Sequence, residues 1–90
     1  MDNFNLKDYQ AKICSNVKRI RKDLYNENKQ YCKEKGIRNP YSAEAVSELL
    51  NITYEYYKRL ESFDVNKTIS LKLILKLSLI FGVDIDEFFK

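Results

Sequence analysis

The 90-residue chain has no histidine, no tryptophan, one proline, two glycines and two cysteines. An all-β fold needs a turn signal about every 8–12 residues, so this shortage of turn formers favours helices. Without histidine or a CxxC pair, Cys14 and Cys32 cannot complete a zinc site. If both cysteines lie on one helix, eighteen residues place them about 27 Å apart, beyond the roughly 7 Å that a disulfide spans. We therefore expect reduced thiols and no metal.

The chain also lacks the residue groups that carry catalysis. It has no glycine-rich phosphate loop, and neither cysteine has a histidine to act as its base. The acids Asp84, Asp86 and Glu87 are better explained as residues at a helix start, where the helix dipole favours negative charge. We expect no enzyme activity, no cofactor and no small-molecule substrate.

Long apolar runs are missing as well. Residues 1–12 contain no apolar stretch typical of a signal peptide. The longest apolar segment, Leu71 to Val83, is interrupted by Lys72 and Lys76 and is shorter than the roughly 18 residues that a membrane span needs. These features predict a soluble, cytoplasmic protein without a membrane partner.

What is present suits one small packed domain over residues 1–90, because 44% of the residues are hydrophobic. The net charge of +3 is uneven. Residues 1–38 carry ten Lys/Arg against five Asp/Glu (+5), and residues 39–90 carry six against eight (−2). A basic first segment suits a polyanionic partner if it faces that partner, whereas the alternative is a lysine-rich helix that faces solvent.

The first expected helix follows an arm of residues 1–8. Its apolar residues are spaced at the helical period, at Tyr9, Ile13, Val17, Ile20, Leu24 and Tyr31. The helix can run as far as Lys35, because Gly36 supplies a left-handed stop. Asn39-Pro40 then marks a connecting loop.

Two shorter helices are expected next. Ser42 caps a helix over 43–50 whose buried side is Val46, Leu49 and Leu50. Asn51 can end this helix, and Thr53 can cap another from Tyr54 to Glu61 or Ser62. Two short helices joined by a tight turn form a helix-turn-helix over residues 43–62.

The last two helices are expected over residues 70–89, after a polar link at 64–68. Ser70 caps a segment from Leu71 to Phe81 in which leucines also alternate as in a strand. Helix is favoured because leucine and lysine are strong helix formers, eleven residues is long for a strand, and Gly82 follows at a typical C-terminal stop. Asp84 and Glu87 match a capping box for a short helix that docks Ile85, Phe88 and Phe89 onto the core.

The segment from Tyr41 to Phe89 resembles the lambda-repressor/Cro-like helix-turn-helix family, or XRE family. YSAEAVSELLNITYEYYKRLES is similar to its scaffold helix, turn and recognition helix, with Val46, Leu50, Ile52, Tyr57 and Leu60 at the buried positions and Glu61 at a usually acidic one. ISLKLILKLSLIFGVDIDEFF is similar to its last two helices, and NVKRIR at 16–21 to its first. The resemblance implies an all-α, five-helix bundle with a central helix-turn-helix and, here, an extended first helix.

The resemblance also implies function. Family members are sequence-specific transcriptional regulators, so we expect a repressor that binds a palindromic operator in double-stranded DNA as a homodimer. The recognition helix would read bases with Tyr54, Glu55, Lys58 and Arg59. Phosphate contacts would come from Ser42, Ala43 and Thr53 at helix N-termini and from Arg19, Arg21 and Lys67. The candidates for the dimer interface are Leu73, Leu79, Ile80 and Phe89.

The chain departs from the family pattern in ways that support an alternative. Ala43 stands where the family commonly has glutamine, and roughly ten extra residues lie between Leu24 and Tyr41. Residues 42–62 carry four acids against Lys58 and Arg59, which disfavours a phosphate-rich partner. The tyrosines of this segment, Tyr54, Tyr56 and Tyr57, suit a protein interface. The alternative is therefore a protein–protein interaction module that keeps the helix-turn-helix frame and binds DNA weakly or not at all.

Overall fold

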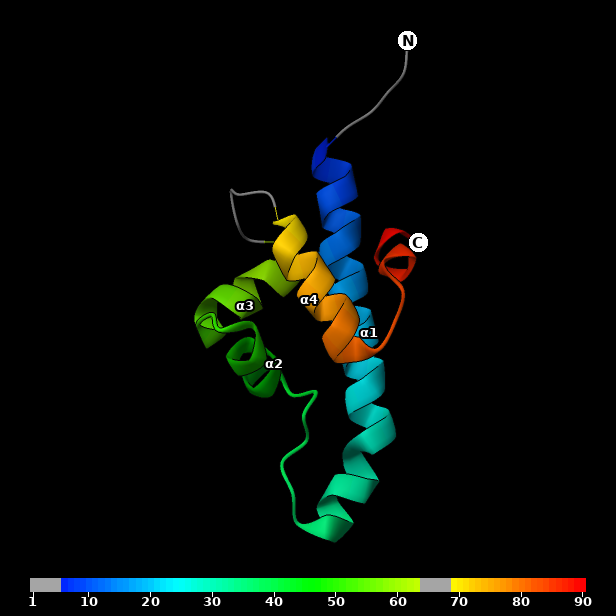
Figure 1. The fold of residues 1–90 in the computed structure, drawn as a ribbon, viewed down its shortest axis with the longest axis vertical. Helices are drawn as coiled ribbons and strands as arrows, with labels where there is room; N and C mark the ends of the chain where they lie inside the picture. Colours follow the sequence, from blue (N-terminus) through cyan, green and yellow to red (C-terminus); the bar gives the residue numbers. More distant parts are fainter. Residues whose placement is uncertain (1–5, 64–68) are drawn as a thin grey trace.

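The computed structural model describes residues 6–63 and 69–90, and within these ranges the chain is helical with no strand (Figure 1). The all-helical prediction is confirmed. The elements in chain order are α1 (Leu6–Lys35), α2 (Ala43–Leu50), α3 (Tyr54–Glu61), α4 (Leu71–Phe81) and a 3₁₀ turn, η1 (Ile85–Phe89). Lys67, the polar link at 64–68 and most of the expected arm lie outside the described residues.

Helix α1 has 30 residues and is about 45 Å long. It ends as the sequence predicts, because Gly36 adopts a φ of +66° and the amide of Ile37 donates to the carbonyl of Cys32 (3.0 Å). It begins at Leu6, so the expectation of an arm reaching residue 8 is wrong. Nothing in residues 6–8 opposes a helix, and Asp8 in the first turn interacts favourably with the helix dipole.

The core-facing side of α1 is Ile13, Val17 and Ile20, as the spacing indicates. Tyr9 and Tyr31, however, are about half exposed. Figure 1 shows why for Tyr31: the C-terminal third of α1 runs past the other helices, and only the connection to α2 returns along it. Asn39 in this connection donates to the carbonyl of Tyr25 on α1 (3.0 Å). In the C-terminal third of α1, the side chain of Cys32 is buried.

A tight turn joins α2 to α3 and fixes their relative direction. Ser42 Oγ accepts from the amide of Ala45, and Thr53 Oγ1 accepts from the amide of Tyr56, each at 3.1 Å. Between them Asn51 takes a left-handed conformation (φ 60°), as predicted. Leu49 was expected to be buried but is 58% exposed, because the core face of α2 runs through Ala45, Val46 and Leu50.

Helix α4 has the bounds that the sequence predicts, so the strand interpretation of its leucines is wrong. Ser70 Oγ accepts from the amide of Leu73 (3.2 Å), and Gly82 adopts a φ of +67° at the other end. Exposed leucines nevertheless remain on α4 at Leu71 (65%), Leu75 (49%) and Leu79 (83%), with a spacing of four residues. These three residues are called the α4 leucine ridge below.

The C-terminal segment is a single 3₁₀ turn rather than a capped α-helix. Asp84 makes no side-chain capping hydrogen bond, and Glu87 instead accepts from Lys90 Nζ (2.7 Å). Tertiary contacts hold this turn: Phe88 is fully buried, and Asn16 on α1 donates to its carbonyl (2.9 Å). Phe89, which was expected to dock, is 45% exposed.

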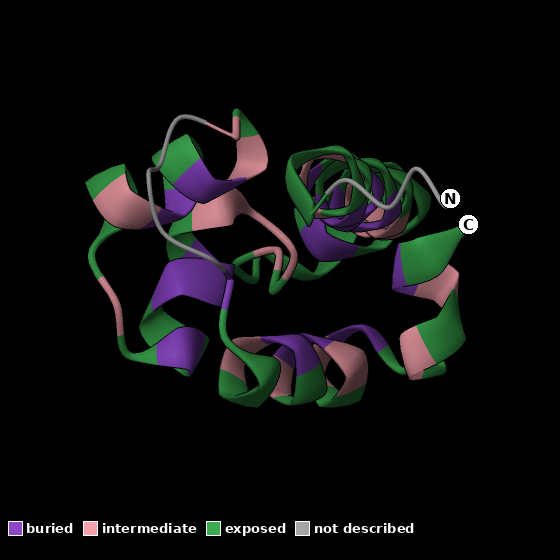
Figure 2. Cartoon of the chain, turned by 90° about the horizontal axis from the view of Figure 1, so that it is seen from above, coloured by how far each residue is buried: buried purple, intermediate pink, exposed green. Residues whose placement is uncertain are grey.

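The core lies between α1 on one side, α2 with α3 on another, and α4 below them (Figure 2). Its members come from every element: Ile13, Cys14, Val17, Ile20, Val46, Leu50, Tyr57, Leu60, Ile69, Ile74, Leu77, Phe81 and Phe88. No helix in the described ranges is long and apolar enough to cross a membrane.

Candidate nucleic-acid interface

A buried ion pair between Arg21 and Glu61 joins α1 to α3. Arg21 Nη2 lies 3.1 Å from Glu61 Oε1, its Nε lies 2.5 Å from Oε2, and its Nη1 donates to the carbonyl of Tyr41 (3.0 Å). Both side chains are at least nine-tenths buried. Burial acts against the charge of Arg21, but the hydrogen bonds and the charge of Glu61 outweigh it and raise the pKa of Arg21. One guanidinium therefore holds α1, α3 and the entry to α2 together.

Tyr57 lies fully buried beside this pair. Burial, and then the negative charge of Glu61, raise the pKa of Tyr57 far above its ordinary value, so the phenol stays neutral. Within the described part of the chain its hydroxyl makes no well-aligned hydrogen bond. Tyr57 and Leu60 thus form the inner side of α3, and its other side is left for solvent.

The outer side of α3 carries the four residues predicted to read bases. Glu55, Lys58 and Arg59 are exposed, and Tyr54 is 38% exposed. Lys58 Nζ lies 5.2 Å from the centre of the Tyr54 ring, a cation–π contact that holds the ammonium along the helix surface. The structure therefore gathers these four side chains on one short, accessible helix face.

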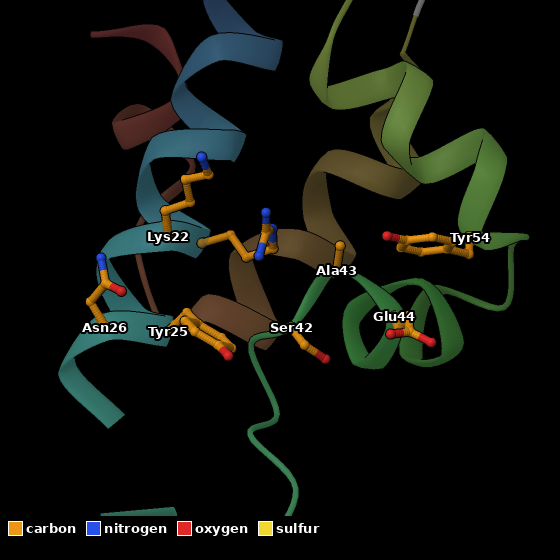
Figure 3. Close-up of a pocket in the computed structure, with 8 residues that line it drawn as sticks. Lys22, Tyr25, Asn26, Ser42, Ala43, Glu44 and Tyr54 are labelled. Atoms are coloured by element: carbon orange, nitrogen blue, oxygen red, sulfur yellow. The ribbon is translucent and has the colours of Figure 1, made fainter. Parts of the chain in front are cut away.

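Two shallow grooves separate this face from α1. The larger, of about 450 Å³, opens between α1, the start of α2 and the start of α3 (Figure 3). It is lined by Arg21, Lys22, Tyr25, Asn26, Ser42, Ala43, Glu44 and Tyr54. The smaller, of about 210 Å³, continues along α3, where Lys18 and Lys58 both line it. Amino groups from α1 and α3 therefore border the same depression.

Ion pairs with residues outside the segment offset the net negative charge that the sequence places in residues 42–62. Arg21 neutralises Glu61, and Arg38 lies 2.8 Å from Glu48 on the surface. The hydrogen bonds and charge of Arg38 lower the pKa of Glu48. When Arg21 and Arg38 are included, the region has four acidic and four basic side chains instead of four and two. Its local charge is therefore zero rather than −2. Glu44 and Glu55 remain exposed beside the candidate interface.

The expected phosphate contacts are not all available. Ser42, Ala43 and Thr53 lie at the starts of α2 and α3, as expected. Arg19 lies 3.9 Å from Asp23 and also donates to Asn16. Arg21, by contrast, is buried in its ion pair, which contradicts its assignment as a phosphate contact. Arg21 lies four residues after the buried Val17, about 40° from it around the α1 axis, and this spacing was the sequence signal for its burial.

Lys18 was missing from the sequence-based contacts, although it lines the smaller groove. The pattern that could have identified it is the face of α1 on which it lies together with Lys22, one helical turn apart. The four residues expected at a dimer interface differ in how far they are exposed. Leu73 and Ile80 are half-buried and pack on the core, whereas Leu79 and Phe89 are exposed.

Comparison with known proteins gives no match: no family model, no curated protein and no solved structure is significantly similar to this chain. Residues 6–63 and 69–90 also hold no group of three histidine, cysteine or acidic side chains that could bind a metal ion.

Proposed function

We propose that the protein is a sequence-specific DNA-binding regulator of the lambda-repressor/Cro-like type, with α2 as scaffold helix and α3 as recognition helix. The observation that carries the proposal is the exposed outer face of α3, held at a fixed angle by a capped turn on one side and the Arg21–Glu61 pair on the other. A reading helix must be rigid and accessible at once, because base edges accept hydrogen bonds only from well-placed donors.

Each residue of this face has chemistry that suits the major groove. Arg59 and Lys58 can donate to guanine, Glu55 can accept from cytosine, and Tyr54 can contact a thymine methyl or a phosphate. The free amides at the starts of α2 and α3 can bind phosphates without side-chain charge. The regulator acts as a homodimer on half-sites about one helical turn apart, roughly 34 Å.

The proposal is tested by selecting fragments from random DNA and measuring binding of Arg59→Ala to the selected site. We expect a loss of about 1–3 kcal/mol on that site and little change on random DNA. Arg38→Ala removes the same charge from a residue that is paired with Glu48 away from α3, and should leave the site preference intact. Equal losses for Arg59→Ala on selected and random DNA would contradict base reading.

A second candidate is a protein–protein interaction module, favoured by exposed Glu44 and Glu55 and by the tyrosines. In that case the unmodified protein would select no DNA fragment, and its weak DNA binding would show no steep dependence on salt.

A further inference from the structure

The C-terminal two-thirds of α1 carry a charge pattern that the recognition helix does not explain. At 100° per residue, Lys18, Lys22, Lys29 and Lys33 fall within about 60° of one another around the α1 axis. All four are exposed, and none has a carboxylate within 4 Å in the part of the chain that the structure describes. These four residues are called the α1 lysine stripe below.

The acids of the same region gather elsewhere on the helix. Asp23, Glu27 and Glu34 fall within about 40° of one another, and their centre is about 130° from that of the lysine stripe. If the charges served only solubility, a helix would be more stable with positive and negative side chains four residues apart, because opposite charges at that spacing attract. Here Lys18–Lys22, Lys29–Lys33 and Asp23–Glu27 are like-charged pairs at that spacing, which destabilises the free helix. The separation of signs thus works against α1 itself and favours an anionic partner on one side.

The stripe is continuous with the candidate DNA interface. Lys18 lines the smaller groove opposite Lys58, and Lys22 lines the larger groove opposite Tyr54 (Figure 3). From there Lys29 and Lys33 carry the stripe into the part of α1 that runs beyond α2 (Figure 1). Lys18 and Lys33 are separated by about 22 Å along the helix, which corresponds to about seven base pairs.

We infer that the extension of α1 is a phosphate-binding arm, whose lysine stripe contacts the backbone of duplex DNA flanking the bases that α3 reads. This inference rests on the proposed function and adds the role of the extra residues between the first and second helices. Lysine contacts to phosphates carry no sequence information, so the arm increases affinity for every duplex that is long enough to reach it.

The test compares Lys29→Gln/Lys33→Gln with the unmodified protein by fluorescence anisotropy over a series of salt concentrations. The double variant should lower the slope of log K against log salt by about two, equally on selected and random DNA. Lys12→Gln/Lys35→Gln removes the same charge from α1 outside the stripe and should leave the slope unchanged. In Lys29→Gln/Lys33→Gln the lost repulsion between two like charges offsets the lost interaction of Lys33 with the C-terminal end of the helix dipole. Its melting temperature should therefore change little, which separates lost binding from lost folding.

Duplex length provides a second readout. Removing about three base pairs from the end of the flank, those that Lys29 and Lys33 reach beyond Lys22, should weaken the unmodified protein and leave Lys29→Gln/Lys33→Gln unaffected. The arm is refuted if the two double variants lose affinity alike, or if trimming weakens both proteins equally. In either case a site-specific loss in Arg59→Ala would leave the proposed function standing. Failure of the unmodified protein to bind any duplex, with binding only to anionic lipid vesicles, would overturn both proposals.

Discussion

Arg21 and Glu61 are the residues on which the geometry of α3 depends. Removing one partner of a buried ion pair leaves an uncompensated charge and costs about 3–5 kcal/mol. We expect Glu61→Ala to lower the free energy of unfolding by this amount, as measured by urea denaturation. Arg21→Met/Glu61→Leu removes both charges and should be more stable than Glu61→Ala alone. If the single and double variants were equally unstable, the loss would come from packing and not from the uncompensated buried charge of Arg21.

Cys14 provides a pH-dependent prediction at the same scale. Burial raises the pKa of its thiol from 9.0 to about 11. The protonated thiol is therefore favoured in the folded state, and its contribution to stability is complete below pH 9 and is lost as the pH rises through about 11. At pH 9 iodoacetamide should modify Cys14 slowly in the folded protein and rapidly in denaturant, as read by mass spectrometry. Between pH 8 and pH 10.5, Cys14→Ala should lose less stability than the unmodified protein. An identical loss in the two proteins would contradict a raised pKa of the Cys14 thiol.

At the scale of elements, the turn between α2 and α3 depends on its caps. Thr53 Oγ1 satisfies the amide of Tyr56, and no other residue in the described turn takes over this bond. Thr53→Ala should lower the free energy of unfolding by about 1 kcal/mol, whereas Thr53→Ser, which keeps the hydroxyl, should lower it by less. Thermal denaturation followed by circular dichroism measures both. A Thr53→Ser loss as large as that of Thr53→Ala would mean that the methyl group matters more than the cap.

The bounds of the elements were predictable where local chemistry sets them. Ser42, Thr53 and Ser70 start helices, and Gly36 and Gly82 end them, because capping and left-handed backbone geometry involve only neighbouring residues. The start of α1 was missed because the prediction of this helix rested on the apolar spacing that begins at Tyr9, and residues 6–8 precede that residue. The 3₁₀ form of Ile85–Phe89 was missed because Asn16, 72 residues away from Phe88, holds this segment.

The candidate site was also predictable only in part, because some of its contacts join residues that are far apart in the sequence. The four outer residues of α3 follow from its helical period once Tyr57 and Leu60 are taken as buried. The Arg21–Glu61 pair spans 40 residues, and no local pattern brings the two side chains together. From the sequence alone, Arg21 was expected to contact phosphate and Glu61 was counted as an unpaired acid. Both errors come from one tertiary contact, the ion pair between these two residues.

For the whole molecule, the α4 leucine ridge is a row of exposed leucines that folding leaves uncovered among the described residues. Leu71, Leu75 and Leu79 lie along one side of α4, and a two-fold dimer would bury the same ridge from both copies. Leu73 and Ile80, which were also expected at the interface, pack on the core and offer less free surface than the ridge.

The proposed dimer leads to the last prediction. Leu75→Gln/Leu79→Gln changes exposed side chains, so the monomer should fold with little change in melting temperature, while sedimentation should shift from dimer to monomer. Binding to a two-half-site operator should weaken and binding to one half-site should not, because only the dimer links the two contacts into one event. Leu49→Gln alters a similarly exposed leucine on α2 and should leave the dimer intact. A monomeric unmodified protein, or equal dissociation by Leu49→Gln, would remove the ridge as the interface and leave half-site recognition to a single copy of α3.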